Sequence, residues 1–162
     1  MKSWQLRGLV LAAVMVVVRL IQGTLINAFQ AQAGLISLTL VLLFIVGPLL
    51  WGLLDGRSDA RANPDPDRRR DLALTWLLAG LVAGVLSGAV CWLLGLFYDD
   101  LYTGGLANEV TTFASFTALL VFIPASIGVA FGRWRVDRKA GAVGNSDAQG
   151  VVTDVFSAAR SD

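Results

Sequence analysis

The sequence has no histidine and only one cysteine, and charged residues make up just 15% of its 162 positions. Without histidine the chain lacks the commonest general base and metal ligand, and Cys91 alone can form neither an intrachain disulfide nor a multi-thiolate zinc site. No nucleophile with a neighbouring base and no paired acids are visible inside the apolar segments. The sequence therefore predicts no enzyme, no metal site and no cofactor. A net charge of only +1 also argues against a nucleic-acid-binding protein, which normally carries a basic surplus.

Long apolar runs dominate what is present, since 56% of the residues are hydrophobic. Four runs cover about 6–28, 34–54, 72–97 and 110–132. Each can cross a hydrocarbon core of about 30 Å as a helix, which satisfies its own backbone polar groups in lipid. The sequence therefore predicts an all-α polytopic membrane protein with four transmembrane helices. A cleaved signal segment is the alternative for the first run, but Arg19 interrupts it.

Basic residues lie on one side of the predicted spans. The connections on the other side, 29–33 and 98–109, contain neither lysine nor arginine. Because lysine and arginine collect in cytoplasmic segments, both termini are predicted to be cytoplasmic in the inner (plasma) membrane. The predicted organisation is a transmembrane domain over 1–139 and a flexible cytoplasmic tail over 140–162, which is rich in small and polar residues.

The predicted cytoplasmic loop 55–71 contains five arginines and five aspartates around two prolines. The simplest interpretation is a solvated loop whose arginines fix the topology, with Asp65 capping the third helix and Pro66 in its first turn. Docking to anionic lipid headgroups or to a partner protein is the alternative. The interleaved aspartates weaken that alternative.

Part of the first predicted hairpin recurs in the second. Trp4-x-Leu6-x-Gly8-Leu9-Val10 is repeated as Trp76-x-Leu78-x-Gly80-Leu81-Val82, and Gly52-x-x-x-Gly56-Arg57 as Gly128-x-x-x-Gly132-Arg133. Two parallel hairpin repeats would explain this echo, a symmetry seen in secondary transporters. Chance matching between apolar helices is the alternative.

Arg19 is the outstanding anomaly, because it lies thirteen residues after Leu6 and so about 20 Å along the first helix. A transmembrane arginine is costly and usually faces the bundle interior or a wet cavity. Gln22 shares its helix face, and Asn27 flanks that face. Glu109, at the outer start of the fourth helix, is the expected counter-ion, followed by Asp99 and Asp100.

Arg19, Gln22, Asn27 and Glu109 are therefore the candidate site residues, and the sequence allows two roles for them. They form either a fixed ion pair or anchor that orders the bundle, or a group that binds a solute in a passage. The positions that match Arg19 and Glu109 in the echo are Cys91 and Ala31, so the two charges break the internal symmetry.

Three glycines in the third predicted helix, Gly80, Gly84 and Gly88, form a double Gly-x-x-x-Gly pattern. This pattern favours close helix contact, either within the chain or with a second subunit. Because four helices enclose little space, a transporting chain is expected to form a parallel homodimer in the lipid bilayer.

Four segments carry a resemblance to a known family: Trp4-x-Leu6-x-Gly8-Leu9-Val10, Ala33-Gly34-Leu35-Ile36-Ser37-Leu38, Gly132-Arg133-Trp134, and the loop Asp55-Gly56-Arg57-x-Asp59-Ala60-Arg61-Ala62-Asn63-Pro64-Asp65-Pro66-Asp67-Arg68-Arg69. With them the chain resembles small actinobacterial membrane proteins classed as bacterial four-helix drug/metabolite transporter-type proteins. The resemblance implies a small secondary transporter of drug-like or metabolite solutes. A non-transporting accessory or scaffold protein of an envelope complex is the alternative.

Overall fold

The computed structural model describes residues 3–97 and 105–159, with side chains up to residue 142. Within these ranges the chain is helical and has no strand. The four long helices are α1 (Ser3–Ala28), α2 (Ala33–Ala62), α3 (Leu72–Gly95) and α5 (Ala114–Ala159). Short turns join them: η1 (Gln30–Gln32), η2 (Pro66–Arg68), α4 (Leu106–Asn108) and the π-helical turn η3 (Glu109–Phe113).

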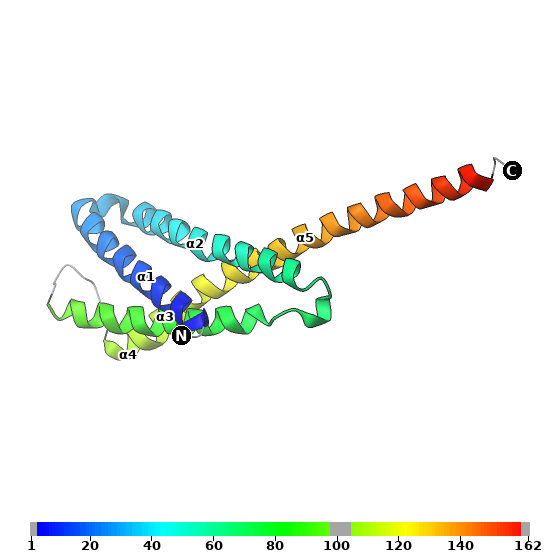
Figure 1. Cartoon of the computed structure of the whole chain (residues 1–162). Coiled ribbons are helices and arrows are strands. Elements are labelled where there is room, and N and C mark those ends of the chain that lie inside the picture. The colour runs from blue at the N-terminus through cyan, green and yellow to red at the C-terminus, as the bar shows by residue number, and fades with distance from the viewer. Residues whose placement is uncertain (1–2, 98–104, 160–162) are drawn as a thin grey trace.

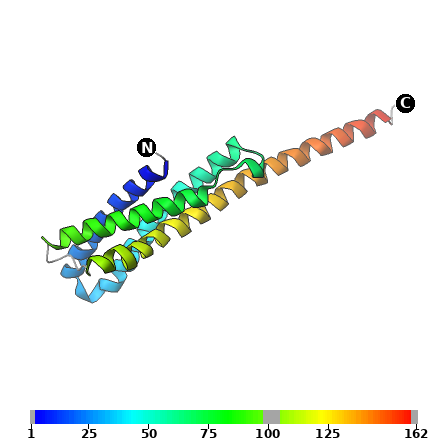
Figure 2. The same cartoon turned by 90° about the horizontal axis from the view of Figure 1, so that it is seen from below.

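All four long segments are apolar and long enough to cross a membrane, which confirms the predicted all-α membrane fold. Figures 1 and 2 show how they are arranged: α3 and α5 lie side by side, α1 packs against α3, and α2 packs against α5. α1 and α2 meet at η1 and then diverge, so that they contact each other only sparsely.

The two hairpins are therefore packed differently, in spite of their sequence echo. α3 and α5 are closed against each other, whereas α1 and α2 form an open V. The helix surfaces differ as well, since Gly84 and Gly88 of α3 correspond to the larger Ala12 and Val16 in α1.

Glycine allows α3 to touch the backbone of the last span. A Cβ atom at Gly80 would lie 2.7 Å from the carbonyl oxygen of Ala118, and Gly84 faces the backbone of Ala114 in the same way. No real Cβ fits at such a distance. The Gly-x-x-x-Gly surface of α3 is thus used inside the chain, so the predicted homodimer would need a different surface.

α2 and α5 approach each other equally closely, and here both helices contribute glycines to the contact. Gly52 and Gly56 of α2 lie against the backbone of α5 at Ala125 and Val129. In return, two glycines of α5 lie against the backbone of α2: Gly128 and Gly132. The backbone of α5 is consequently in direct contact with two helices, α2 on one side and α3 on another.

The connection between α2 and α3 is shorter than predicted, because 55–62 continues α2 instead of belonging to a loop. The predicted capping role of Asp65 is also wrong. Its side chain accepts a hydrogen bond from the backbone N–H of Asp67 and caps η2, whereas Asp71 accepts one from Leu74 and caps α3. Pro66 begins the short turn η2, so Asp65 caps this turn, and α3 starts only later, after Asp71.

α5 continues as a helix through 140–159 and extends beyond the other helices (Figure 2). We expected a tail without regular structure in this region. No proline follows Pro124, and several alanines favour helix over the intervening glycines. The flexibility of this segment stays a prediction, and residues 160–162 lie outside the described ranges.

Replacing Gly84 with alanine tests the backbone contact between α3 and α5. We expect Gly84→Ala to lower the free energy of unfolding by about 1 to 3 kcal/mol, because the added methyl group collides with a neighbouring backbone. Thermal unfolding in detergent measures the change. Gly47→Ala is the matched control, since a Cβ there meets nothing within 4 Å. Equal melting temperatures for the two variants would contradict the packing argument.

Candidate functional site

The structure brings Arg19 of α1 and Glu109 of η3 together. Arg19 Nη1 lies 2.5 Å from Glu109 Oε2, and Nη2 lies 3.4 Å from Oε1. The Glu109 side chain is only 3% exposed and that of Arg19 15% exposed, so this is a buried, two-pronged ion pair. Asp99 and Asp100, the other expected counter-ions, lie outside the described residues.

Neighbouring side chains and backbone fix the geometry of this pair. The ring of Phe113 lies 4.0 Å from Arg19 Cζ, which adds a cation–π contact. The buried thiol of Cys91 in α3 also interacts with Arg19. Gly88 leaves the room that Glu109 needs, because a Cβ at Gly88 would lie 2.5 Å from the Glu109 carbonyl oxygen. The π-helical turn that carries Glu109 is a rare element, found frequently at functional sites.

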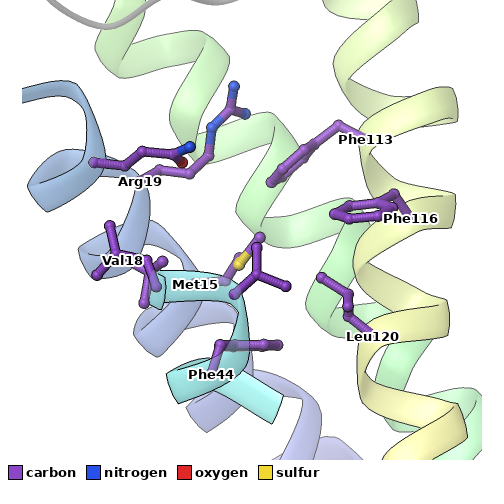
Figure 3. A pocket seen from close by; sticks show the side chains of 10 residues that line it. Met15, Val18, Arg19, Phe44, Phe113, Phe116 and Leu120 are labelled. Carbon is purple, nitrogen blue, oxygen red and sulfur yellow. The ribbon is translucent and has the colours of Figure 1, made fainter. Parts of the chain in front are cut away.

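A pocket of about 250 Å³ adjoins Arg19, where α1 and α2 diverge. Figure 3 shows Phe113, Phe116 and Leu120 on one side of this space, facing Met15 and Val18 of α1 on the other. Its lining comes from α1, α2, η3 and α5: Met15, Val18, Arg19, Gln22, Leu40, Val41, Phe44, Phe113, Phe116 and Leu120. The pocket is therefore apolar except for one guanidinium and one amide.

Gln22 both lines the pocket and joins the two arms of the V. Its Nε2 donates a hydrogen bond of 2.9 Å to Ser37 Oγ in α2, and that hydroxyl donates to the carbonyl oxygen of Ala33. Asn27 lies farther along α1, is exposed and is not part of the pocket lining. Arg19 thus lies beside both Glu109 and the pocket that Gln22 lines, whereas Asn27 is outside that lining.

Sequence reasoning missed the aromatic wall of the pocket. Phe44, Phe113 and Phe116 come from segments far apart in the chain, and each is one of many apolar residues in its helix. The helical spacing of Leu40, Val41 and Phe44 marks one face of α2. Nothing in the sequence indicates that this face meets Arg19.

A second group of paired charges, some buried and some exposed, lies near the other end of the bundle. Asp59 of α2, with a 3% exposed side chain, accepts hydrogen bonds of 3.1 and 2.6 Å from Arg133 of α5. It also accepts one of 3.3 Å from the backbone N–H of Arg70. Arg69 binds Asp137 of α5 at 2.6 and 2.9 Å. These contacts tie the connection before α3 to α5 and serve the fold.

Chemically, the pocket at Arg19 is suited to recognition of a polar group on a small solute. A guanidinium beside apolar walls offers directed hydrogen bonds to a carboxylate, phosphate or carbonyl group of a solute. Within the ranges that the structure describes, no three His, Cys, Asp or Glu side chains are grouped to hold a metal ion.

Comparison with known proteins adds no name to this site. A scan against protein-family models finds no match to the chain, and neither does a search of curated proteins. The pocket and its charged pair are therefore the features that bear on function.

A double-mutant cycle tests the energetic coupling of Arg19 and Glu109. We expect Arg19→Leu or Glu109→Leu alone to cost about 3 to 5 kcal/mol of stability, because either leaves a buried charge without its partner. The double variant should lose much less than the sum of the two. Thermal unfolding in detergent gives the three values.

The exposed pair Asp65–Arg68 provides the control cycle, since its atoms are 3.6 Å apart and its side chains are 54% and 83% exposed. Its coupling should stay within about 1 kcal/mol. A coupling at Arg19 and Glu109 as small as this would argue against a buried ion pair.

Proposed function

We propose that the protein is a small secondary transporter that moves a drug-like or metabolite solute across the cytoplasmic membrane through the pocket at Arg19. The observation that carries the proposal is this pocket itself, which lies within the span of α1 and borders a buried ion pair. Ionisable residues inside a membrane commonly mark solute pathways. An apolar lining with a few polar groups is typical of small-molecule sites.

The size and chemistry of the pocket limit the solute. Its volume of about 250 Å³ lies just below the range of roughly 300 to 1,000 Å³ usual for small-molecule sites, so the solute is small. Phe44, Phe113 and Phe116 favour an aromatic or otherwise apolar body. Arg19 and Gln22 favour a hydrogen-bond-accepting group, such as a carboxylate.

Binding of such a group has a direct mechanical consequence. A solute carboxylate at Arg19 competes with Glu109, and the Arg19–Glu109 pair links α1 to η3. Because α1 and α2 contact each other sparsely, weakening this link loosens the attachment of α1 on the open side of the V. Solute binding and helix movement are thereby coupled, as alternating access requires.

Uptake into proteoliposomes tests this function. Val41 lines the pocket, so Val41→Trp fills the space without touching the ion pair, whereas Leu42 is 55% exposed and Leu42→Trp adds the same ring outside it. Across a panel of small organic anions and cations, we expect saturable uptake by the wild type and Leu42→Trp, and at least a tenfold loss in Val41→Trp.

Both solute-driven current and uptake of labelled solute should be measured, because electroneutral exchange produces no current. Equal transport by both tryptophan variants would rule out this pocket as the route. Absence of transport in every folded protein would favour the accessory role.

The orientation belongs to the same proposal: both termini face the cytoplasm from the inner membrane. The support is the concentration of basic residues near the end of the bundle opposite η1, including Arg57, Arg61 and Arg133. Single cysteines in a Cys91→Ser background test it. A membrane-impermeant thiol reagent applied to spheroplasts should label Ala31→Cys, and should reach Ala140→Cys only after permeabilisation. The reverse pattern would invert the topology.

One observation favours the accessory or scaffold role as a second candidate. The helix of α5 continues to Ala159 beyond the bundle, which offers a partner an extended surface (Figure 1). Removal of 143–162 separates the two functions, since a transporter with its pocket intact should retain uptake without this segment.

A further inference from the structure

A basic groove of about 240 Å³ lies between α2 and α5, at the end of the bundle opposite η1. Arg57 and Arg61 contribute from α2, and Arg135 and Lys139 from α5, with Val136 between them. Within each pair the residues are four positions apart, so they occupy successive turns of one helix face. Four cationic side chains, hereafter the groove cations, therefore converge on one space.

The aspartates of the same segment point elsewhere. Because 55–62 is helical, Asp55 and Asp59 share one face, and the arginine two positions after each is rotated by about 200° from it. Asp55 pairs with Arg7 at 3.0 Å, and Asp59 pairs with Arg133 at 2.6 Å. The carboxylates of Asp55 and Asp59 are thus already ion-paired inside the bundle.

The groove cations themselves take no part in these two ion pairs. Among the residues with described side chains, no ion pair joins any of them to an aspartate or glutamate. In sequence, the interleaved aspartates weakened the case for an anion-binding surface. The helix places the positive and the negative side chains, which alternate in the sequence, on different faces. The objection from the interleaved aspartates therefore no longer holds.

An apolar strip leads to the groove along α2. Leu50 and Leu54 lie on the same helix face as Arg57 and Arg61, since the four are spaced at four, three and four positions. Both leucines are more than half exposed, at 54% and 60%. This face therefore changes from apolar to basic along its length, as a lipid changes from acyl chain to headgroup.

The glycine contact holds the two sides of the groove together. Gly56 and Gly132, where the backbones of α2 and α5 touch, lie within one turn of Arg57 and Arg135. Like charges brought so near repel one another, and a bound anion relieves this repulsion. The rigid contact thus favours an anionic occupant without any movement of the helices.

We propose that the groove cations bind the phosphate-bearing headgroup of an anionic phospholipid, whose acyl chains lie along Leu50 and Leu54. Arginine forks bind phosphate oxygens in pairs, and juxtamembrane basic clusters attract anionic lipids. Soluble phosphate compounds share the headgroup chemistry. They lack the acyl chains for which the exposed leucines provide a surface. The proposal does not depend on transport.

Lipid binding to the full-length protein tests this assignment. Native mass spectrometry and thermal unfolding should compare phosphatidylglycerol with phosphatidylcholine at fixed ionic strength. We expect the wild type to prefer phosphatidylglycerol about tenfold, and Arg61→Gln/Arg135→Gln to lose that preference. The control Arg68→Gln/Arg138→Gln removes the same charge from residues outside the groove and should keep it.

Two further measurements complete the test. The melting temperatures of both double variants in phosphatidylcholine should match that of the wild type, which separates lipid binding from folding. Glycerol phosphate and inorganic phosphate, added as competitors, should not displace phosphatidylglycerol at concentrations up to a hundredfold excess. Displacement by either compound would assign the groove to a soluble phosphate ligand, and equal lipid preference in both double variants would overturn the site.

Discussion

The backbone contact of α5 with α2 and α3 is the constraint on which the rest of the structure depends. Glycines on both sides remove the side chains that would keep the helices apart, so α5 occupies a fixed position between its neighbours. That position places Glu109 beside Arg19 at one level, and Arg133 beside Asp59 at another. It also leaves α1 and α2 without a comparable surface for each other, and the pocket lies in the space between them.

The two buried ion pairs act on this framework in different ways. In lipid the attraction between helices is not driven by the hydrophobic effect, so a paired charge chiefly specifies which faces meet. Asp59 and Arg133 sit beside the glycine contact of α2 and α5 and fix the rotation of the two helices about it. Arg19 and Glu109 lie where the packing is looser, next to a pocket. The first pair stabilises a contact that is already close, and the second joins parts that are otherwise weakly connected.

The sequence was sufficient for features with strong local signals. Apolar length alone indicated the four spans, and the cost of a charge in lipid singled out Arg19 and its counter-ion. The sequence was insufficient for features that depend on which helix faces pack against each other. Apolar residues on every side of a membrane helix conceal its contact face, so Phe44 could not be assigned to the pocket, nor Gly84 to α5. At the start of α3, Asp65 and Asp71 are both suitable caps, and only the extra turn η2 distinguishes them.

The length of α5 has a mechanical consequence. At 1.5 Å per residue its 46 residues extend for about 69 Å, more than twice the thickness of a hydrocarbon core of about 30 Å. A continuous helix of this length behaves as a lever whose fulcrum is the glycine contact. A change of a few degrees in its tilt, too small to alter the packing beside Glu109, displaces the distant end by several ångströms. A small movement at the end of α5 beside Glu109 is thereby amplified at its opposite end.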